Sequence, residues 1–317
     1  MEKIIQKIQE QIGAGIYPGA SLALYQKGSW QEYYLGLADP DKQEPVIPGL
    51  TYDLASVSKV VGVGTVLAFL VRQGQIDIDR PLASHYPDME QAEVTIRQLL
   101  THTSGLDPFI PRRDDLDAEG LKEALHRLKL KDKRQFHYTD VNFLLLGFLL
   151  EKWFGLDLDH IFQEQVFEPW QMKETTFGPV SQAVPTICGL PGGVVHDPKA
   201  RVLGVHAGSA GLFSTIRDME FFLEHYLQDP FAEILSQNYA LEEGKTRSLA
   251  WNLEGDWLDH TGYTGTFLLY NRKLQLAAIF LSNRTYEKDE RAQWILDRNQ
   301  LMELIKTEME VASKNPS

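Results

Sequence analysis

The sequence has little cysteine, no excess of basic residues and no long hydrophobic run. It contains one cysteine among 317 residues, Cys188, which excludes an internal disulfide and a cysteine-rich zinc site. Lys and Arg total 31 against 44 Asp and Glu, so the formal charge is −13. An acidic chain is a poor match for nucleic acid or an anionic membrane surface, and we expect neither as a partner.

The apolar stretches predict no membrane-spanning segment. The longest uncharged ones, residues 60–71 and 143–150, are shorter than the roughly 20 residues that a spanning helix needs. The isoleucines between residues 4 and 12 recur at helical spacing among charged residues, and no apolar region or cleavage site of a secretory signal follows. We therefore expect a cytoplasmic protein.

Strand patterns lie at both ends of the chain, and helical patterns lie between them. A hairpin is predicted from residues 20–26 and 30–36, with further strands over 248–253, 265–270 and 274–281. Helices are predicted over residues 56–73, 94–101, 118–128, 142–154, 218–227 and 292–311. One sheet built from both termini, with a helical insertion, accounts for this order of elements.

Two subdomains follow from this division. We expect a discontinuous sheet subdomain of residues 1–79 and 212–317, and a mainly helical subdomain of residues 80–211. The Gly/Pro-rich stretch over residues 184–211 has little periodicity, and a long loop of this kind is usually functional or disordered. We expect it to line the cleft between the subdomains.

The motif Ser56-Val57-Ser58-Lys59 places a serine and a lysine one helical turn apart. A serine hydroxyl is a poor nucleophile unless a base takes its proton, and a lysine can be that base if burial or positive neighbours lower its pKa. The apolar run after Lys59 would supply such burial. Many exposed helices contain this motif by chance, so the motif alone leaves both interpretations open.

Two other segments could complete a site. Tyr138-Thr139-Asp140 stands just before an apolar helix, where Tyr138 is either a second candidate base or an interfacial side chain with its hydroxyl in water. Residues 260–265 contain small residues that let backbone N–H groups approach a ligand and form an oxyanion hole. The alternative for this segment is a glycine-rich connection between strands.

No metal or cofactor is expected. A His-Glu-x-x-His pattern is absent, and nine histidines are scattered through the chain. We expect His102 to cap or pack a helix end, His196 and His206 to line the cleft, and Cys188 to be an unreactive loop thiol.

Together these segments resemble the serine β-lactamase and penicillin-binding-protein-like superfamily. They are most similar to its class C β-lactamase-like branch, which includes esterases and D-amino-acid-specific peptidases. The superfamily uses Ser-x-x-Lys, a second motif with Tyr or Ser, and Lys-Thr-Gly or a variant. Here Ser56–Lys59, Tyr138–Asp140 and His260–Gly262 occur in the same order, and residues 99–106, 211–215 and 281–284 are also similar. The resemblance implies an α+β fold, an antiparallel sheet flanked by helices with an inserted all-helical subdomain.

The resemblance also implies roles for the matched residues. Ser56 would be the acylated nucleophile, and Lys59 and Tyr138 would share the acid/base work. The backbone N–H groups of Ser56 and Tyr263 would form the oxyanion hole. The substrate-binding residues would be Asp140, His260, Thr261 and Gly262.

Two departures from the family pattern bear on the substrate. Asp140 stands where the second motif usually has Asn, and a carboxylate cannot donate the hydrogen bond of an amide. His260 stands where the third motif usually has Lys, so a permanent cation for a substrate carboxylate is missing. Both changes favour a serine hydrolase that acts through an acyl-enzyme on a small ester or amide. The alternatives are a weak β-lactamase or D-alanyl peptidase, and a penicillin-binding or sensing protein with little turnover.

Overall fold

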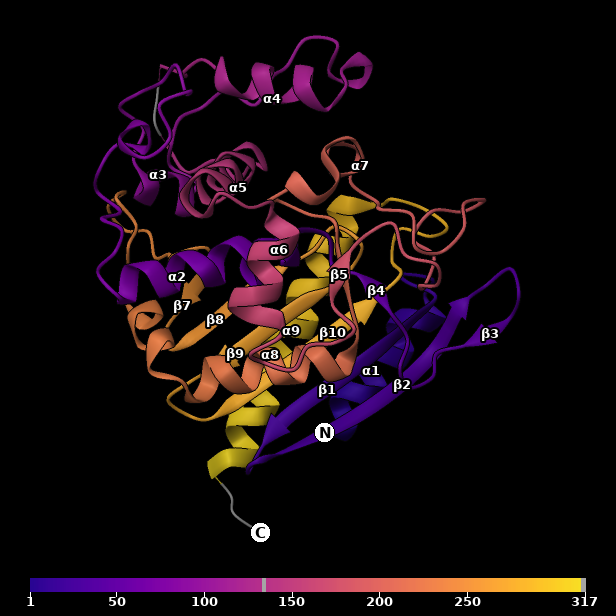
Figure 1. The fold of residues 1–317 in the computed structure, drawn as a ribbon. Helices are drawn as coiled ribbons and strands as arrows, with labels where there is room; N and C mark the ends of the chain where they lie inside the picture. The colour runs from indigo at the N-terminus through magenta and orange to yellow at the C-terminus, as the bar shows by residue number, and fades with distance from the viewer. Residues whose placement is uncertain (133–134, 315–317) are drawn as a thin grey trace.

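The computed structural model describes residues 1–132 and 135–314 (Figure 1). Its larger sheet has seven antiparallel strands in the order β3-β2-β1-β10-β9-β8-β7. In chain order these strands are β1 (Gly19–Gln26), β2 (Ser29–Asp39), β3 (Glu44–Pro45), β7 (Asn252–Glu254), β8 (Trp257–Thr261), β9 (Phe267–Asn271) and β10 (Leu276–Ser282).

The pairing of β1 with β10 joins the two ends of the chain. Ala20 lies opposite Ser282 and Tyr25 lies opposite Ala277, and all of β10 is buried. Side chains alternate between the faces of the sheet, so Leu22 and Leu24 pack with α1 (Glu2–Gly13) and α9 (Arg291–Lys314). The prediction of one sheet from both termini, flanked by helices, is confirmed.

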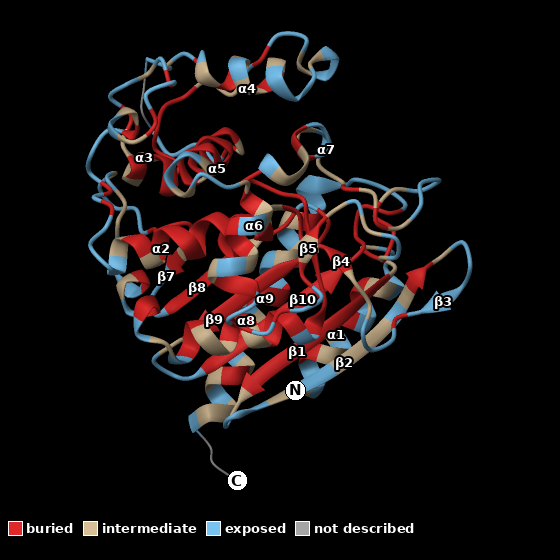
Figure 2. Ribbon diagram, viewed as in Figure 1, coloured by how far each residue is buried: buried red, intermediate tan, exposed pale blue. Residues whose placement is uncertain are grey.

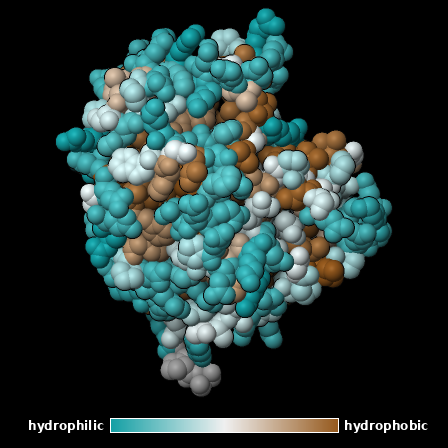
Figure 3. Space-filling model, viewed as in Figure 1, coloured by the Kyte–Doolittle hydropathy of each residue, from teal (hydrophilic) through white to brown (hydrophobic). Residues whose placement is uncertain are grey.

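The opposite face of the sheet carries the larger core. Figure 2 shows buried residues filling the sheet and the helices above it. Ala23 and Tyr25 join this core, with α2 (Thr65–Arg72), α8 (Ile216–Gln228) and α5 (Val141–Phe154). The remaining α-helices are α3 (Ile96–Leu100), α4 (Ala118–His126), α6 (Leu158–Phe162) and α7 (Pro198–Leu203). Figure 3 shows a mainly hydrophilic surface over the upper helices, with hydrophobic patches in the band between them and the sheet.

A small second sheet ties distant parts of the chain together. It has the order β4-β6-β5, formed by β4 (Tyr52–Asp53), β6 (Leu212–Ser214) and β5 (Thr176–Phe177). Because β5 comes from the middle of the chain and β4 ends shortly before Ser56, this sheet holds the middle segment near the serine. The predicted subdomain boundaries, after residues 79 and 211, stay a prediction.

The predicted helix over residues 56–73 is present as one helical run, Ala55–Arg72, but the type of helix changes along it. The chain forms a 3₁₀ turn (Ala55–Val57), then a π-helical turn (Val60–Gly64) and only then α2. Thr65 Oγ1 donates to the Val60 carbonyl at 2.7 Å, which stabilises the wider turn. The stretch Ala55–Arg72 is apolar and long enough to cross a bilayer, but 78% of it is buried inside the protein, as in a core helix.

The predicted strand over residues 248–253 is largely wrong. Only Asn252 and Leu253 of that range belong to β7, because Ala250 turns the chain with a φ of 69°. Strand β8 was not predicted, since its buried polar residues Asp259 and His260 hide the strand pattern. The structure thus places His260 and Thr261 on a strand of the main sheet.

Close packing at Gly62 gives a stability prediction. A Cβ at this position would lie 2.4 Å from Cε2 of the buried Phe162 ring. We expect Gly62→Ala to lower the free energy of unfolding by about 1–3 kcal/mol, as overpacked core substitutions do. Chemical denaturation measures this, with Gly13→Ala as the control because a Cβ at Gly13 meets nothing within 4 Å. Equal stabilities of the two variants would contradict the packing argument.

Candidate active site

Ser56 and Lys59 lie at the start of the buried helical run. Lys59 Nζ donates to Ser56 Oγ at 2.8 Å and to the Ser209 carbonyl at 3.0 Å, and Lys59 has no exposed surface. Ala55 has a φ of 47°, a left-handed conformation that costs a non-glycine residue about 1 kcal/mol or more. Asp53 holds this turn by accepting the Ala55 N–H at 2.8 Å. The strained turn therefore fixes Ser56 against its lysine.

Asp140 lies between two lysines. Its Oδ1 is 2.7 Å from Lys59 Nζ, and its Oδ2 is 3.0 Å from the Nζ of Lys199 on α7. Burial would raise the pKa of the Asp140 carboxyl, but the two ammonium groups outweigh burial and hold the pKa well below its usual range. Asp140 is therefore an anion with both oxygens engaged.

Lys59 is a cation in this arrangement. Burial lowers its pKa, but Asp140 and then Tyr138 outweigh burial, so the pKa of Lys59 lies above its ordinary value. The burial predicted from the apolar run is present, while its expected effect on the pKa is reversed by Asp140. Lys59 must lose a proton before it can accept one from Ser56.

Tyr138 covers Lys59 from the second motif. The Lys59 Nζ lies 5.1 Å from the centroid of the Tyr138 ring. The centroid of the His102 ring lies 4.5 Å from the centroid of the same tyrosine ring. His102 is buried and its Nδ1 accepts from the Thr139 N–H at 3.3 Å and from Asn142 Nδ2 at 3.0 Å. His102 was expected to cap or pack a helix end, and these two hydrogen bonds hold the start of α5 and the turn that carries Tyr138.

The third segment is fastened to the turn before the serine. Thr264 Oγ1 donates to the Asp53 carbonyl and Thr266 Oγ1 to the Leu54 carbonyl, both at 3.0 Å. A Cβ at Gly262 would lie 2.7 Å from the Leu54 carbonyl oxygen, so a glycine permits this approach. The contacts bring the backbone around Tyr263 next to Ser56.

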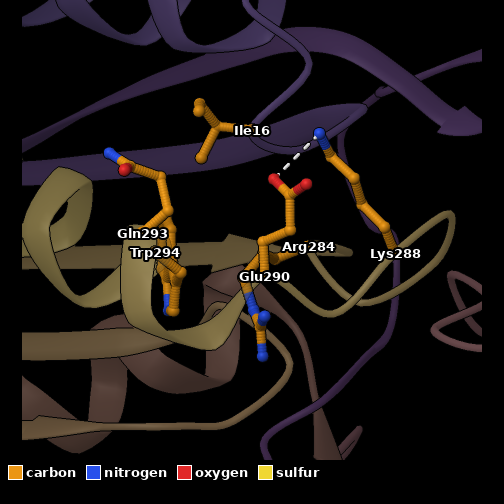
Figure 4. A pocket seen from close by; sticks show the side chains of 6 residues that line it. All are labelled: Ile16, Arg284, Lys288, Glu290, Gln293 and Trp294. Atoms are coloured by element: carbon orange, nitrogen blue, oxygen red, sulfur yellow. Dashed lines mark ion pairs between the residues drawn. The ribbon is translucent and has the colours of Figure 1, made fainter.

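Arg284 supports Tyr263 from behind. Its Nε donates to the Tyr263 carbonyl at 3.1 Å, and its Nη1 forms an ion pair with Asp289 at 2.6 Å. In Figure 4 the Arg284 side chain lines a small hollow together with Trp294, while Lys288 and Glu290 pair across its rim. The hydrogen bonds from Arg284 anchor the carbonyl of Tyr263 and so hold the Tyr263–Thr264 peptide in place.

His260 is buried and neutral at pH 7. Burial, and then the charges of Lys59 and Arg247, hold the pKa of His260 well below its ordinary value. Its neighbour Thr261 accepts a hydrogen bond from Arg298 Nη1 at 3.1 Å. His260 is therefore not a cation, as expected, but the charges of two arginines, Arg247 and Arg298, act on it.

Three cations near the site, Arg247, Arg298 and Lys199, were not among the residues predicted from the sequence. Arg247 is 5% exposed, and burial lowers its pKa to about 10, so it remains charged at pH 7. Its charge acts on both His102 and His260. Arg247 belongs to a polar run whose pattern predicts only a loop. The Asp-Pro pair before Lys199, by contrast, does predict the start of a helix, α7.

The histidines and the cysteine that were considered in the sequence do not form a metal-binding cluster among the described residues. Within residues 1–132 and 135–314, no group of three or more His, Cys, Asp or Glu side chains could hold a metal ion. His206 pairs with Glu151, and the His196 N–H donates to Asp53 Oδ2 at 2.7 Å. Cys188 is an exposed free thiol.

Comparison with known proteins identifies the family. The beta-lactamase family matches residues 4–302. The putative D-alanyl-D-alanine carboxypeptidase of Salmonella gallinarum is 24% identical over 355 aligned positions, which cover 88% of this chain and 81% of the relative.

Solved structures share the fold. The beta-lactamase/D-alanine carboxypeptidase from Pseudomonas syringae has a TM-score of 0.74 at 18% identity, covering 94% of this chain and 97% of its own. EstCE1, a hydrolase with promiscuous acyltransferase activity, has a TM-score of 0.76 at 17% identity, covering 95% and 97%. The chain belongs to the beta-lactamase family, and homologues of this fold are serine hydrolases.

Proposed function

We propose that the protein hydrolyses small esters or amides through an acyl group carried on Ser56. The observation that carries this proposal is the 2.8 Å hydrogen bond from the fully buried Lys59 Nζ to Ser56 Oγ. A serine joined to a buried lysine, beside a tyrosine, is an arrangement for activating a hydroxyl group.

Acylation moves one proton and exchanges two bonds. Once Lys59 has released a proton to solvent, Ser56 Oγ bonds to the substrate carbonyl carbon while the Ser56 proton passes to the Tyr138–Lys59 pair. The bond to the leaving group then breaks, and the leaving group takes that proton. In deacylation a water molecule attacks the ester, gives its proton to the same pair, and Ser56 regains a proton as it leaves.

The oxyanion hole is assigned to two backbone N–H groups, those of Ser56 and Tyr263. The hydrogen bonds of Thr264 and Thr266 to the turn before Ser56 support this assignment, since they hold the two peptides side by side. Donors fixed in advance stabilise the charge that develops on the carbonyl oxygen, at about 2.7–4 kcal/mol for each donor.

A buried arginine, Arg247, favours a second, narrower candidate: a substrate with a carboxylate, such as a D-alanyl peptide or a β-lactam. Arg247 lies near Tyr138 and His260, and its Nε has no hydrogen-bond partner among the described residues. A buried donor without a partner is costly, and a ligand carboxylate would satisfy it. Several curated relatives are named putative D-alanyl-D-alanine carboxypeptidases, which supports the same candidate.

Arg247→Met tests the carboxylate. We expect the KM for a D-alanyl-D-alanine peptide to rise about tenfold to a hundredfold, because a charge-assisted hydrogen bond is lost. The KM for a neutral nitrophenyl ester should rise less. Steady-state kinetics on both substrates measure this, and Arg298→Met is the companion variant at the second arginine whose charge acts on His260. An equal rise in KM for both substrates would contradict the assignment of Arg247 to carboxylate binding.

Burst kinetics separate an enzyme from a penicillin-binding or sensing protein. With a nitrophenyl ester, sustained release of nitrophenol after the first equivalent supports the hydrolase. A single stoichiometric burst without further turnover supports the sensing protein, in which the acyl group stays on Ser56.

A further inference from the structure

A second lysine reaches the site from the long loop. Lys199 Nζ lies 3.0 Å from Asp140 Oδ2 and 3.5 Å from Asp197 Oδ2, and its side chain is only 14% exposed. Asp197 also caps α7 by accepting the Ala200 N–H at 2.8 Å, which fixes the backbone that carries Lys199. Lys199 is therefore part of an ordered ion-pair network and not a mobile surface lysine.

The carboxylate of Asp140 offers one oxygen to each lysine. Without Lys199, the Asp140 carboxylate would pair with Lys59 alone. Opposite charges 2.7 Å apart attract strongly where little water is present, so this pairing would stabilise the protonated form of Lys59. Burial lowers the pKa of Lys59, but Asp140 outweighs it. A charge that offsets Asp140 therefore brings Lys59 closer to releasing its proton.

No other group named around Lys59 offsets the charge of Asp140 among the described residues. Besides Asp140, the titratable side chains that act on Lys59 or feel its charge are Tyr138, His102 and His260, with Arg247 beyond them. Burial above all holds both histidines neutral at pH 7, and Tyr138 raises the pKa of Lys59. Arg247 donates to Asn252 and Ala250 near β7. Among the described residues, Lys59 and Lys199 are the two cations that pair with Asp140.

We propose that Lys199 is a positioning residue of the reaction: by sharing the carboxylate of Asp140 with Lys59, it leaves Lys59 able to exchange a proton with Ser56. The proposal rests on the proposed function, because it concerns proton transfer during acylation. Lys199 acts through Asp140, so its removal matters only while position 140 carries a charge.

A double-mutant cycle tests this coupling. The variants are Lys199→Met, Asp140→Asn and the two combined, with Lys199→Gln as a second form of the first and circular dichroism as the check of folding. Lys199→Arg keeps the charge, and Lys173→Met removes an exposed lysine elsewhere as a matched control. For each variant, kcat/KM for a nitrophenyl ester is measured across the pH range in which lysine and tyrosine titrate.

Lys199→Met should move the rising limb of the pH profile by about one unit to higher pH, which lowers kcat/KM at pH 7 about tenfold. Asp140→Asn should move the limb to lower pH, and adding Lys199→Met to it should change nothing further. Lys199→Arg and Lys173→Met should keep the wild-type profile.

The proposal is overturned if Lys199→Met and Lys199→Gln lower kcat/KM equally with Asp or Asn at position 140, or leave the limb in place. A failure of the proposed function looks different. In that case Ser56 of the unmodified protein would not be labelled by a fluorophosphonate, whatever residue stands at position 199.

Discussion

Replacement of Ser56 by alanine is expected to lower kcat for ester hydrolysis by about 10⁴-fold or more, with the fold unchanged. Loss of the nucleophile removes the covalent route and leaves only binding and the oxyanion hole to act. Within the part of the chain that the structure describes, the Ser56 side chain accepts one hydrogen bond, from Lys59, and donates none, so little stability is lost. Steady-state kinetics and thermal denaturation of the purified variant measure both effects.

Ser58→Ala is the matched control for this variant. Ser58 belongs to the same motif and is buried, and its Oγ accepts the Leu212 N–H at 3.2 Å. We expect a loss of about 1 kcal/mol of stability from the missing hydrogen bond, with kcat nearly unchanged. If Ser58→Ala abolished turnover and Ser56→Ala did not, the nucleophile would have been assigned to the wrong serine.

Lys59→Met should lower kcat by about 10²- to 10⁴-fold, the range typical for loss of a general acid or base. Methionine has a similar length, so it fills the space without leaving a large cavity. Asp140 keeps Lys199 as its partner, so no unpaired carboxylate is left in the site. The activity that remains should also lose the rising limb of its pH profile that belongs to Lys59.

Lys152→Met controls for the loss of a lysine, since Lys152 is exposed on α5. It should keep both kcat and the pH profile. Full activity in Lys59→Met would contradict the assignment of Lys59 to proton transfer and would leave Tyr138 as the base.

The sheet and its helices could be predicted from local patterns. The hairpin around Gly28 and the helices ending near Phe154 and Leu227 follow from turn residues and from apolar periods, and the structure has them within a few residues. Strand β8 could not be predicted this way. Its polar residues Asp259 and His260 are buried by parts of the chain far away in sequence, which a local pattern does not contain.

The chemistry of the site divides in the same way. The spacing of Ser56 and Lys59 places them in contact on any helical backbone, so their hydrogen bond was predictable. The charge state of Lys59 depends on how Asp140 is shared with Lys199 of α7, and the spacing within the motif does not contain this information. Arg247, missed for the same reason, supplies a cation near the place where His260 lacks one.

The most direct test of the account is to locate the acyl group. The protein is mixed with a nitrophenyl ester, quenched in acid during turnover and digested with trypsin, and the peptide of residues 43–59 is sequenced by tandem mass spectrometry. The account predicts one acyl group on Ser56, absent from Ser56→Ala. Continued turnover with that peptide unmodified, or with the acyl group on Ser58, would contradict it.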